Sequence, residues 1–213
     1  MDFVIAVDGP AASGKGTVAS RLAAAFALPY LDTGILYRAV GVGVADPGDP
    51  AEAEAYARAL RLEAVDEALV RTAAAGEAAS RVAAHPGVRA ALIALQRDFA
   101  AQPGGAVLDG RDIGTVIAPD APAKLFVTAA AEVRAERRWK QLCGQGEDIS
   151  YEAVLADIRR RDERDSGRAA APLAQADDAV LLDTTHLSIP QAADAARRIV
   201  EAARGPWEKS RRG

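Results

Sequence analysis

Several features that mark large classes of protein are scarce in this sequence. Cys143 is the only cysteine, which excludes an internal disulfide framework and a metal site built from several cysteines. The two histidines, His85 and His186, have no metal-ligand partner at a useful spacing, so we expect surface or capping roles for them. The N-terminal apolar run, Phe3–Val7, is too short for a signal peptide or a membrane span. We therefore expect a cytoplasmic protein with no membrane partner.

An excess of basic charge is also missing. The chain has 213 residues, with 26 Lys and Arg against 30 Asp and Glu, and a formal net charge of −4. A global positive field that would attract nucleic acid is therefore absent, and we expect no nucleic-acid partner. The sequence shows no internal repeat, and we expect a monomer.

Short apolar runs alternate with helical patterns along the chain. Runs rich in β-branched residues predict buried strands, and four-residue spacing, as at Val18, Leu22 and Phe26, predicts one-faced helices between them. Strands that alternate with helices form a parallel sheet with helices on both faces, so we predict a doubly wound α/β protein of about five strands. The predicted strands are residues 3–7, 29–31, 106–109, 124–128 and 179–183; the predicted helices are 14–27, 34–40, 86–100, 131–142, 150–164 and 188–204.

The strongest chemical signal joins the first predicted strand to the first predicted helix. Glycines there let backbone N–H groups point at phosphate oxygens, and Lys15 can reach the β- and γ-phosphates of a nucleoside triphosphate. Because Gly16 precedes Thr17, the usual hydroxyl comes one residue late, and we expect Mg²⁺ to be held largely through phosphate and water, with Thr17 as candidate ligand. The alternative is an ordinary turn. The predicted ATP-binding residues are Gly9, Pro10, Ala11, Ala12, Ser13, Gly14, Lys15, Gly16 and Thr17.

Two further strand ends carry groups that suit a second anion. Thr33 follows the second predicted strand as a helix-capping hydroxyl, with Arg38 one turn later. Arg111 and Asp112 follow the third strand along the chain, at the sheet edge where ligands bind in open α/β sheets. Taken singly, Thr33 and Arg38 also fit an N-cap followed by a surface arginine. Arg111 and Asp112 also fit an ordinary turn.

Arginines crowd residues 159–168, and Arg134, Arg137 and Arg138 lie on the preceding predicted helix. The plain interpretation is a solvated face crossed by ion pairs between residues four apart. The functional interpretation is a helical hairpin that closes over a transferring phosphoryl group, where positive charge and the exclusion of water both help.

Together these segments resemble bacterial cytidylate kinase along nearly the whole chain, and in the order of that family. The segments are GPAASGKGT (9–17), LDTGILYR (31–38), ASRVAAHPGVR (79–89), LDGRDIGTVIAPDAPAKLFVTA (108–129), RDERDSGRAAAPL (161–173) and LLDTTHLSIPQ (181–191). The resemblance implies a P-loop NTPase-type fold and the phosphorylation of CMP and dCMP to CDP and dCDP by ATP with Mg²⁺.

The resemblance also implies roles for individual residues. Cytosine presents an acceptor and a donor on one edge, which an arginine and a carboxylate can satisfy together, whereas uracil would present a carbonyl to the carboxylate. The implied CMP-binding residues are Thr33, Arg38, Ser80, Arg89, Arg111, Asp112, Arg161, Asp165 and Arg168, with Ser80, Arg89 and Asp112 at the cytosine edge. The implied catalytic set is Lys15, Arg111, Arg161 and Arg168.

We expect one kinase domain over residues 1–213. Many family members carry a small β-rich insertion before the serine equivalent to Ser80, whereas residues 46–78 are short, alanine-rich and helical in composition. A reduced acceptor-binding flap is therefore expected. The expected division is a core of 1–39, 86–130 and 174–204, an insertion at about 40–85, a lid at about 131–173, and a solvated tail at 205–213.

Two other functions stay open at this point. One is a related kinase of a small acceptor, such as UMP, AMP or a shikimate-like molecule; the other is a P-loop ATP-binding switch that is not a kinase. Asp8 and Asp109 end strands near the loop, where they could orient metal-bound water or cap turns. For Tyr37 and Trp139, packing competes with a place in the site.

Overall fold

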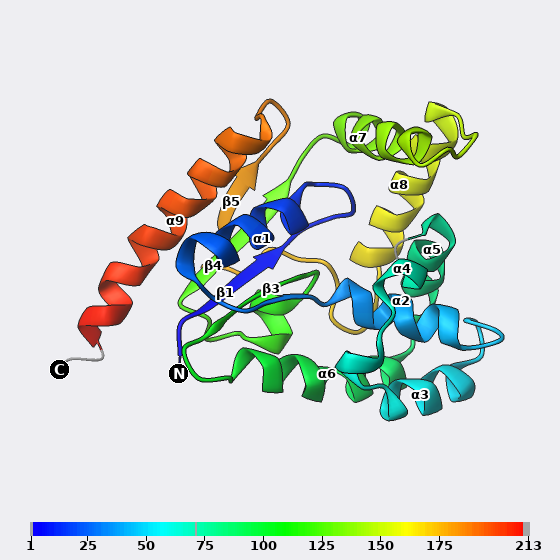
Figure 1. Ribbon diagram of the computed structural model, residues 1–213, viewed down its shortest axis with the longest axis horizontal. Coiled ribbons are helices and arrows are strands. Elements are labelled where there is room, and N and C mark those ends of the chain that lie inside the picture. The colour runs from blue at the N-terminus through cyan, green and yellow to red at the C-terminus, as the bar shows by residue number, and fades with distance from the viewer. Residues whose placement is uncertain (1, 71, 211–213) are drawn as a thin grey trace.

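The computed structural model describes residues 2–70 and 72–210. Its centre is a five-stranded parallel sheet in the order β2-β3-β1-β4-β5 (Figure 1). The strands are β1 (Val4–Asp8), β2 (Tyr30–Asp32), β3 (Ala106–Gly110), β4 (Ala123–Thr128) and β5 (Val180–Asp183). The predicted fold class is confirmed, and so are the five predicted strands, because short β-branched runs between helices leave few other options.

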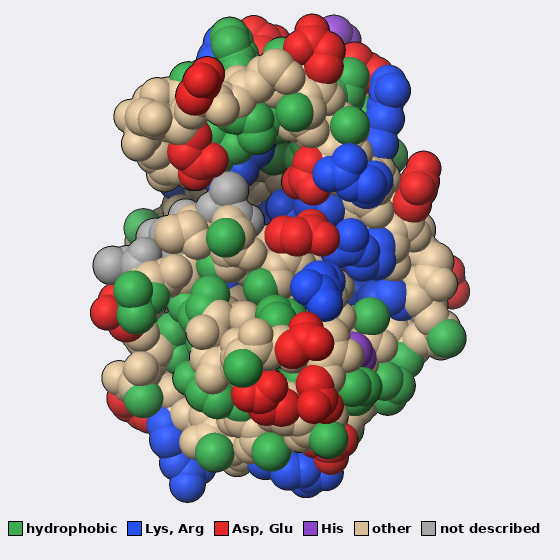
Figure 2. All heavy atoms as spheres, turned by 90° about the vertical axis from the view of Figure 1, so that its right-hand side faces the viewer, with side chains coloured by type: hydrophobic (Ala, Val, Ile, Leu, Met, Phe, Trp, Pro, Cys, Tyr) green, Lys and Arg blue, Asp and Glu red, His purple; other side chains and the backbone are tan. Residues whose placement is uncertain are grey.

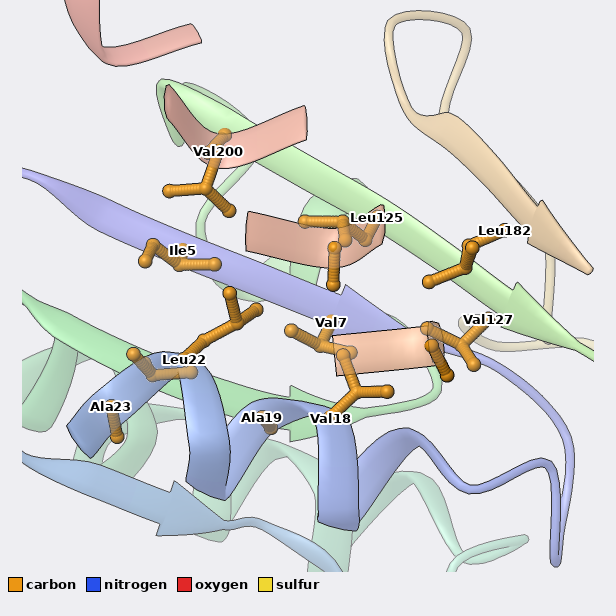
Figure 3. Close-up of a cluster of buried hydrophobic side chains, with 14 of the residues drawn as sticks. Ile5, Val7, Val18, Ala19, Leu22, Ala23, Leu125, Val127, Leu182 and Val200 are labelled. Carbon is orange, nitrogen blue, oxygen red and sulfur yellow. The ribbon is translucent and has the colours of Figure 1, made fainter. Parts of the chain in front are cut away.

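The central strand sorts its side chains onto two faces. Ile5 and Val7 pack against α1 (Lys15–Phe26) and α9 (Ile189–Ser210), as Figure 3 shows for the cluster around Leu22 and Val200. Val4 and Ala6 join a second cluster with α6 (Pro86–Ala100) and the π-helical turn η2 (Ile113–Ile117). Successive strand residues point to opposite faces, so an unbroken apolar run is what a strand covered on both sides requires.

The region between β2 and α6 is helical, as its composition predicted. It contains α2 (Gly34–Gly43), α3 (Pro50–Ala59), η1 (Leu62–Ala64), α4 (Glu67–Val70) and α5 (Ala73–Val82). Asp49 caps α3 by accepting from the Ala51 N–H at 2.9 Å, and Thr72 caps α5 by accepting from the Ala75 N–H at 3.1 Å. These helices form a core of their own with the start of α6.

The helices α7 (Ala131–Gly144) and α8 (Tyr151–Ser166) form a hairpin beyond the carboxyl ends of the strands (Figure 1). Their shared core includes Leu142, Val154 and Ile158, and it extends to Ala11 of the P-loop. The indole of Trp139 donates to the Ile149 carbonyl at 2.9 Å, so this tryptophan packs within the hairpin. Among residues 2–70 and 72–210, no helix combines the length and apolar composition that crossing a bilayer requires.

The C-terminal segment differs from its prediction. Residues 205–213 were expected to form a solvated tail, but α9 continues to Ser210; residues 211–213 lie outside the described residues. Trp207 packs on Phe3, with the ring centroids 4.9 Å apart. Ala196, Val200, Ala203 and Trp207 repeat at helical spacing along the face that covers β1. The helix continues through Gly205 and Pro206, and the packing of Trp207 on Phe3 favours this continuation.

Replacing Trp207 with alanine tests this correction. The variant should lose about 1–3 kcal/mol of unfolding free energy, because a half-buried aromatic side chain is removed from the edge of a core. Urea denaturation at constant m-value is the measurement. Lys209→Ala, two residues further at an exposed position, is the matched control and should change stability little. Equal urea-denaturation midpoints for the two variants would instead support the solvated tail that the sequence predicts.

Candidate active site

The loop between β1 and α1 takes its shape from two glycines. A side chain at Gly9 would collide with the Val127 carbonyl of β4, which runs alongside. Gly14 precedes α1 with a φ of +87°, in the left-handed region that favours glycine. The strand–loop–helix context predicted for the phosphate loop is confirmed, and the loop directs its backbone toward the N-terminus of α1.

A pocket of about 500 Å³ lies beside this loop. The volume is in the range of sites for nucleotide-sized ligands. One wall is the loop and the first turn of α1, and the other mixes cations with apolar side chains. The lining includes Ser13, Lys15, Thr17, Arg137, Arg138, Gln141, Thr184, Leu187 and Ile189.

The arginines of α7 contradict their plain interpretation as a solvated face. Arg134 is buried, pairs with Asp162 at 2.6 Å, and donates to the Ala11 carbonyl of the P-loop at 3.2 Å. Arg137 donates to the Thr184 carbonyl at 2.7 Å and lines the pocket together with Arg138. The signal that could have found them is their spacing, because residues 134, 137, 138 and 141 share one face of a helix.

A second pocket lies on the other side of Lys15, between the strand ends, α2, α5, α6 and α8. All nine residues predicted to bind CMP line it, although they come from four separate segments of the sequence. In Figure 2, which views the molecule from the side of α5 and α8, Lys and Arg side chains gather around the hollow where these elements meet. The lining adds Asp32, Tyr37 and Asp109, which sequence reasoning had not placed in the acceptor site.

The hydroxyl of Thr33 does not cap the helix as expected. Thr33 occupies the N-cap position of α2, but the capping oxygen comes from Asp32 before it, whose Oδ1 accepts from the Gly34 N–H at 2.9 Å. Thr33 is buried and donates instead to the Asp109 carbonyl at 2.8 Å, tying the end of β2 to β3. Arg38 approaches the other oxygen of Asp32 at 3.7 Å. The aspartate that ends the strand, and not the threonine after it, therefore organises this corner.

A buried ion pair occupies the end of the second pocket near α5 and α6. Arg89 and Asp112 are 4 % exposed each and are hydrogen-bonded to each other. The guanidinium of Arg89 also lies 5.7 Å from the centre of the Tyr37 ring. The Ser80 hydroxyl beside them is buried and has no hydrogen-bond partner among the described residues. This end therefore offers a donor, an acceptor and an aromatic face within one small space.

The opposite end is dominated by arginines from β3 and α8. Arg111 donates from Nε to Asp165 at 2.8 Å; burial lowers the pKa of Arg111, but Asp165 more than offsets it, so the pKa lies above its ordinary value. Arg168 lies 3.8 Å from Asp165. Burial and the neighbouring Arg111 hold the pKa of Arg161 below its ordinary value, and its buried Nε has no hydrogen-bond partner in the described part of the chain.

The charges of this pocket leave a positive excess. Six cations line it, namely Lys15, Arg38, Arg89, Arg111, Arg161 and Arg168, against the four carboxylates Asp32, Asp109, Asp112 and Asp165. An excess of two positive charges suits a phosphate monoester, which carries nearly two negative charges at neutral pH. Buried charges need partners, so an anion at Arg161 would complete the arrangement.

Lys15 lines both pockets and so stands between them. Burial and the nearby Arg111 lower the pKa of its ammonium from 10.5 to about 8. Burial raises the pKa of Asp109, near the end of β3, above its ordinary value, and the positive charge of Lys15 offsets part of this increase. Among the described residues there is no cluster of three His, Cys, Asp or Glu side chains that could hold a metal. Thr17 is exposed at the mouth of the first pocket.

Comparisons with known proteins identify the family. The family model described as cytidylate kinase matches residues 5–202. The chain is 70% identical over 208 residues to a cytidylate kinase of Caulobacter vibrioides, covering 96% of this chain and 98% of the relative. It is 68% identical over 205 residues to a cytidylate kinase of Xanthobacter autotrophicus, covering 95% and 99%.

A solved structure shares the fold alone. An uncharacterized protein from Eubacterium ventriosum superimposes with a TM-score of 0.57 at 14% identity, covering 94% of this chain and 99% of that chain. The whole-length family match, together with the identity to full-length relatives, decides the assignment: the chain belongs to the cytidylate kinase family.

Proposed function

We propose that the protein phosphorylates CMP and dCMP with ATP, giving CDP or dCDP and ADP. The observation that carries this proposal is the position of Lys15, which lines a P-loop pocket and an adjoining pocket with an excess of positive charge. A kinase needs its donor and acceptor phosphates to meet in line at one cation. Family membership supplies the identity of the nucleotides.

In this proposal the donor triphosphate lies along the P-loop and the acceptor phosphate lies among Arg38, Arg111 and Arg161. These side chains and Lys15 surround the point where the two pockets meet. Phosphoryl transfer spreads charge over the equatorial oxygens, which pre-positioned cations stabilise without a covalent enzyme intermediate. Asp165 holds Arg111 and Arg168 in place rather than contacting the transferring group.

The buried Arg89–Asp112 pair supports a cytosine over a uracil base. Asp112 can accept from the exocyclic amine of cytosine, and Arg89 and Ser80 can donate to its ring nitrogen and carbonyl. Uracil would place a carbonyl against Asp112 and leave a buried acceptor unpaired. Sites that hydrogen-bond a substrate group in this way discriminate strongly against the analogue that lacks it.

Mg²⁺ belongs to the same proposal. Bound with ATP, it would neutralise phosphate charge during transfer. Oxygen donors suit this ion, and the protein's hydroxyl at the mouth of the P-loop pocket is Thr17, with phosphate and water as the remaining ligands. The proposal is completed by a monomer that acts on free nucleotides in the cytoplasm.

Movement of the α7–α8 hairpin is needed to admit the acceptor. The acceptor pocket has a volume of only about 80 Å³, well below the range of ordinary ligand sites. Its roof comes from α8, which meets α5 through an ion pair between Arg164 and Glu77 at 3.0 Å. We propose that the hairpin acts as a lid that separates from α5 when CMP enters and excludes water when it returns.

A panel of acceptors tests the activity. ADP formation from ATP should rise strongly with CMP and dCMP. The kcat/KM for UMP should be at least a hundredfold lower, because the carbonyl of uracil would face Asp112. AMP and shikimate in the same coupled assay represent the related kinases. A background rate with every acceptor would indicate an ATP-binding switch, and a preference for UMP, AMP or shikimate would replace CMP as the substrate.

Arg111→Ala tests the bridging arginine. The turnover number with CMP should fall by about 10²–10³-fold, because a charged donor to the transferring group is lost. Circular dichroism checks that the fold is intact. Arg160→Ala, on the exposed side of α8 where Arg160 pairs with Asp157, is the matched control and should keep near-normal turnover. Near-normal turnover of the Arg111 variant would remove that residue from the proposed mechanism.

The lowered pKa of Lys15 predicts proton uptake when ATP binds. With a pKa of about 8, roughly half of the free protein has a neutral Lys15 at pH 8. Triphosphate charge raises this pKa, so binding should take up to about half a proton at pH 8 and much less at pH 7. Calorimetry in buffers of different ionisation enthalpy measures this uptake. Lys15→Arg, which does not titrate, should abolish it; an uptake that persists in this variant would assign the proton to another group.

A further inference from the structure

Asp8 accepts two backbone hydrogen bonds from across the sheet, and the proposed chemistry assigns it no role. It is the last residue of β1 and is 5 % exposed. Its Oδ1 accepts from the Ile113 N–H at 2.8 Å and its Oδ2 accepts from the Gly114 N–H at 2.7 Å. These N–H groups open the π-helical turn η2, and the first N–H groups of a helical turn have no partner within it. Asp8 therefore caps a turn that lies 105 residues away in the sequence.

The residue at the ordinary capping position of this turn is Asp112, and its side chain does not cap. It is turned instead toward Arg89 in the acceptor pocket. The two carboxylates thus divide two tasks, because Asp8 satisfies the backbone while Asp112 stays available to the acceptor. Without Asp8, the open N–H groups of Ile113 and Gly114 would compete for the Asp112 carboxylate.

Asp8 also connects the two halves of the cleft. It directly precedes Gly9 of the P-loop, and in the sheet it stands opposite Gly110, the residue before Arg111. The fit is tight, because a side chain at Gly114 would come within 3.3 Å of Asp8 Oδ2 and 3.2 Å of Lys124 Cδ. A shift of η2 would therefore carry Arg111 and Asp112 with it.

We propose that Asp8 is a positioning residue for phosphoryl transfer, whose ionised carboxylate fixes η2 and so holds Arg111 and Asp112 in the geometry that the acceptor requires. The proposal rests on the proposed CMP kinase function. It also predicts that Asp8 acts on the acceptor side of the cleft, although it adjoins the donor loop in sequence.

The electrostatics of the site make this role dependent on pH. Burial raises the pKa of Asp8 from 3.8 to about 6, although the Gly114 and Ile113 N–H groups lower it. Asp112 raises it further and Arg111 lowers it. Lys124 of β4 and Arg97 of α6, which donates to the Val116 carbonyl at 3.0 Å, are further charged groups beside the turn, and η2 itself has no ionisable side chain. A protonated carboxyl would turn an O–H toward one of two N–H donors, and that hydrogen bond would be lost.

The same pKa sets the sign of the effect on stability. Because the folded-state pKa is the higher one, Asp8 contributes stability that is fully present below about 3.8 and is lost as the pH rises through about 6. Activity should change in the opposite direction, since the ionised form is the competent one. A group that only stabilised the fold would move stability and activity together.

Asp8→Asn is the decisive variant, with Asp120→Asn as the matched control at an exposed position just beyond η2. In Asp8→Asn the kcat/KM for CMP should fall by about 10–100-fold, since a small misplacement of catalytic groups has effects of this size. The Kd for ATP, measured by calorimetry, should stay within about threefold of wild type. Loss of ATP binding in step with turnover would show that Asp8 only supports the P-loop, and unchanged kcat/KM for CMP would also overturn the proposal.

The pH profile gives a second, independent comparison. Nucleotide phosphates themselves titrate near pH 6, so the informative quantity is the activity ratio of wild type to Asp8→Asn. This ratio should rise between about pH 5 and 7, while the unfolding free energy of wild type relative to the variant falls over the same interval. A ratio independent of pH would contradict the proposal.

If Asp8→Asn does not fold, hydrogen exchange on the wild type decides the matter. Protection of the Ile113 and Gly114 amides, corrected for intrinsic rates, should decrease as the pH falls from 7 to 5, whereas the Ile5 amide in β1 should keep its protection. Equal behaviour of these amides would refute the proposal. Wild-type turnover of CMP in the same assays reports separately on the proposed function, so an active wild type with an unaffected variant would overturn the role of Asp8 alone.

Discussion

Six cations and four carboxylates share one pocket at the ends of the strands, and the folded chain must hold that excess of positive charge partly away from water. Burying charge is costly unless each group has a partner. Two of the carboxylates form ion pairs with arginines: Asp112 with Arg89, and Asp165 with Arg111. Arg161 lacks such a partner at its Nε among the described residues. The lining of the cleft therefore has more positive than negative charge, which suits an anionic substrate.

The contacts that hold the α7–α8 hairpin differ in strength, which bears on its proposed role as a lid. The sheet and its two covering layers are continuous apolar clusters, and Arg134 ties the base of the α7–α8 hairpin to the Ala11 carbonyl. The C-terminal end of α8 meets α5 through Arg164 and Glu77, whose side chains are 30% and 45% exposed. An exposed pair of this kind contributes about 0–1 kcal/mol. Breaking that contact costs little, whereas separating α7 from the P-loop would break the hydrogen bond of the buried Arg134 to the Ala11 carbonyl.

Stability and function pull in opposite directions at Asp8. Its burial opposes ionisation, and its ionised form is the one that satisfies two backbone donors and keeps η2 in place. A hydrophobic or amide side chain would remove the buried charge but would leave an N–H group of the turn unpaired. The two glycines of the P-loop show a related constraint, since Gly9 leaves room for the Val127 carbonyl and Gly14 adopts a φ of +87°.

The sequence was sufficient for the strands, for the strand–loop–helix context of the phosphate loop, and for the segments that meet at the second pocket. Each of these depends on local pattern: β-branched runs for strands, glycine spacing for the loop, and short segments whose order matches one family. The sequence was insufficient for side chains whose conformation depends on a residue far away along the chain. Thr33 has the composition of an N-cap but bonds to Asp109, and the arginines of α7 look solvated until the hairpin packs on the P-loop. Trp207 follows a Gly-Pro pair, yet its packing on Phe3 extends the helix.

By itself, then, the sequence determined the class of fold, the donor loop and the chemical type of the acceptor site, because these are written in residues close together along the chain. The tertiary structure alone decided which groups share a pocket, which carboxylate caps the turn at Ile113, and which buried arginine nitrogens have no hydrogen-bond partner among the described residues. The reason is physical. Hydrogen bonds and buried ion pairs act over a few ångströms, and only folding brings Asp8, Arg89 and Arg161 within reach of residues tens of positions away.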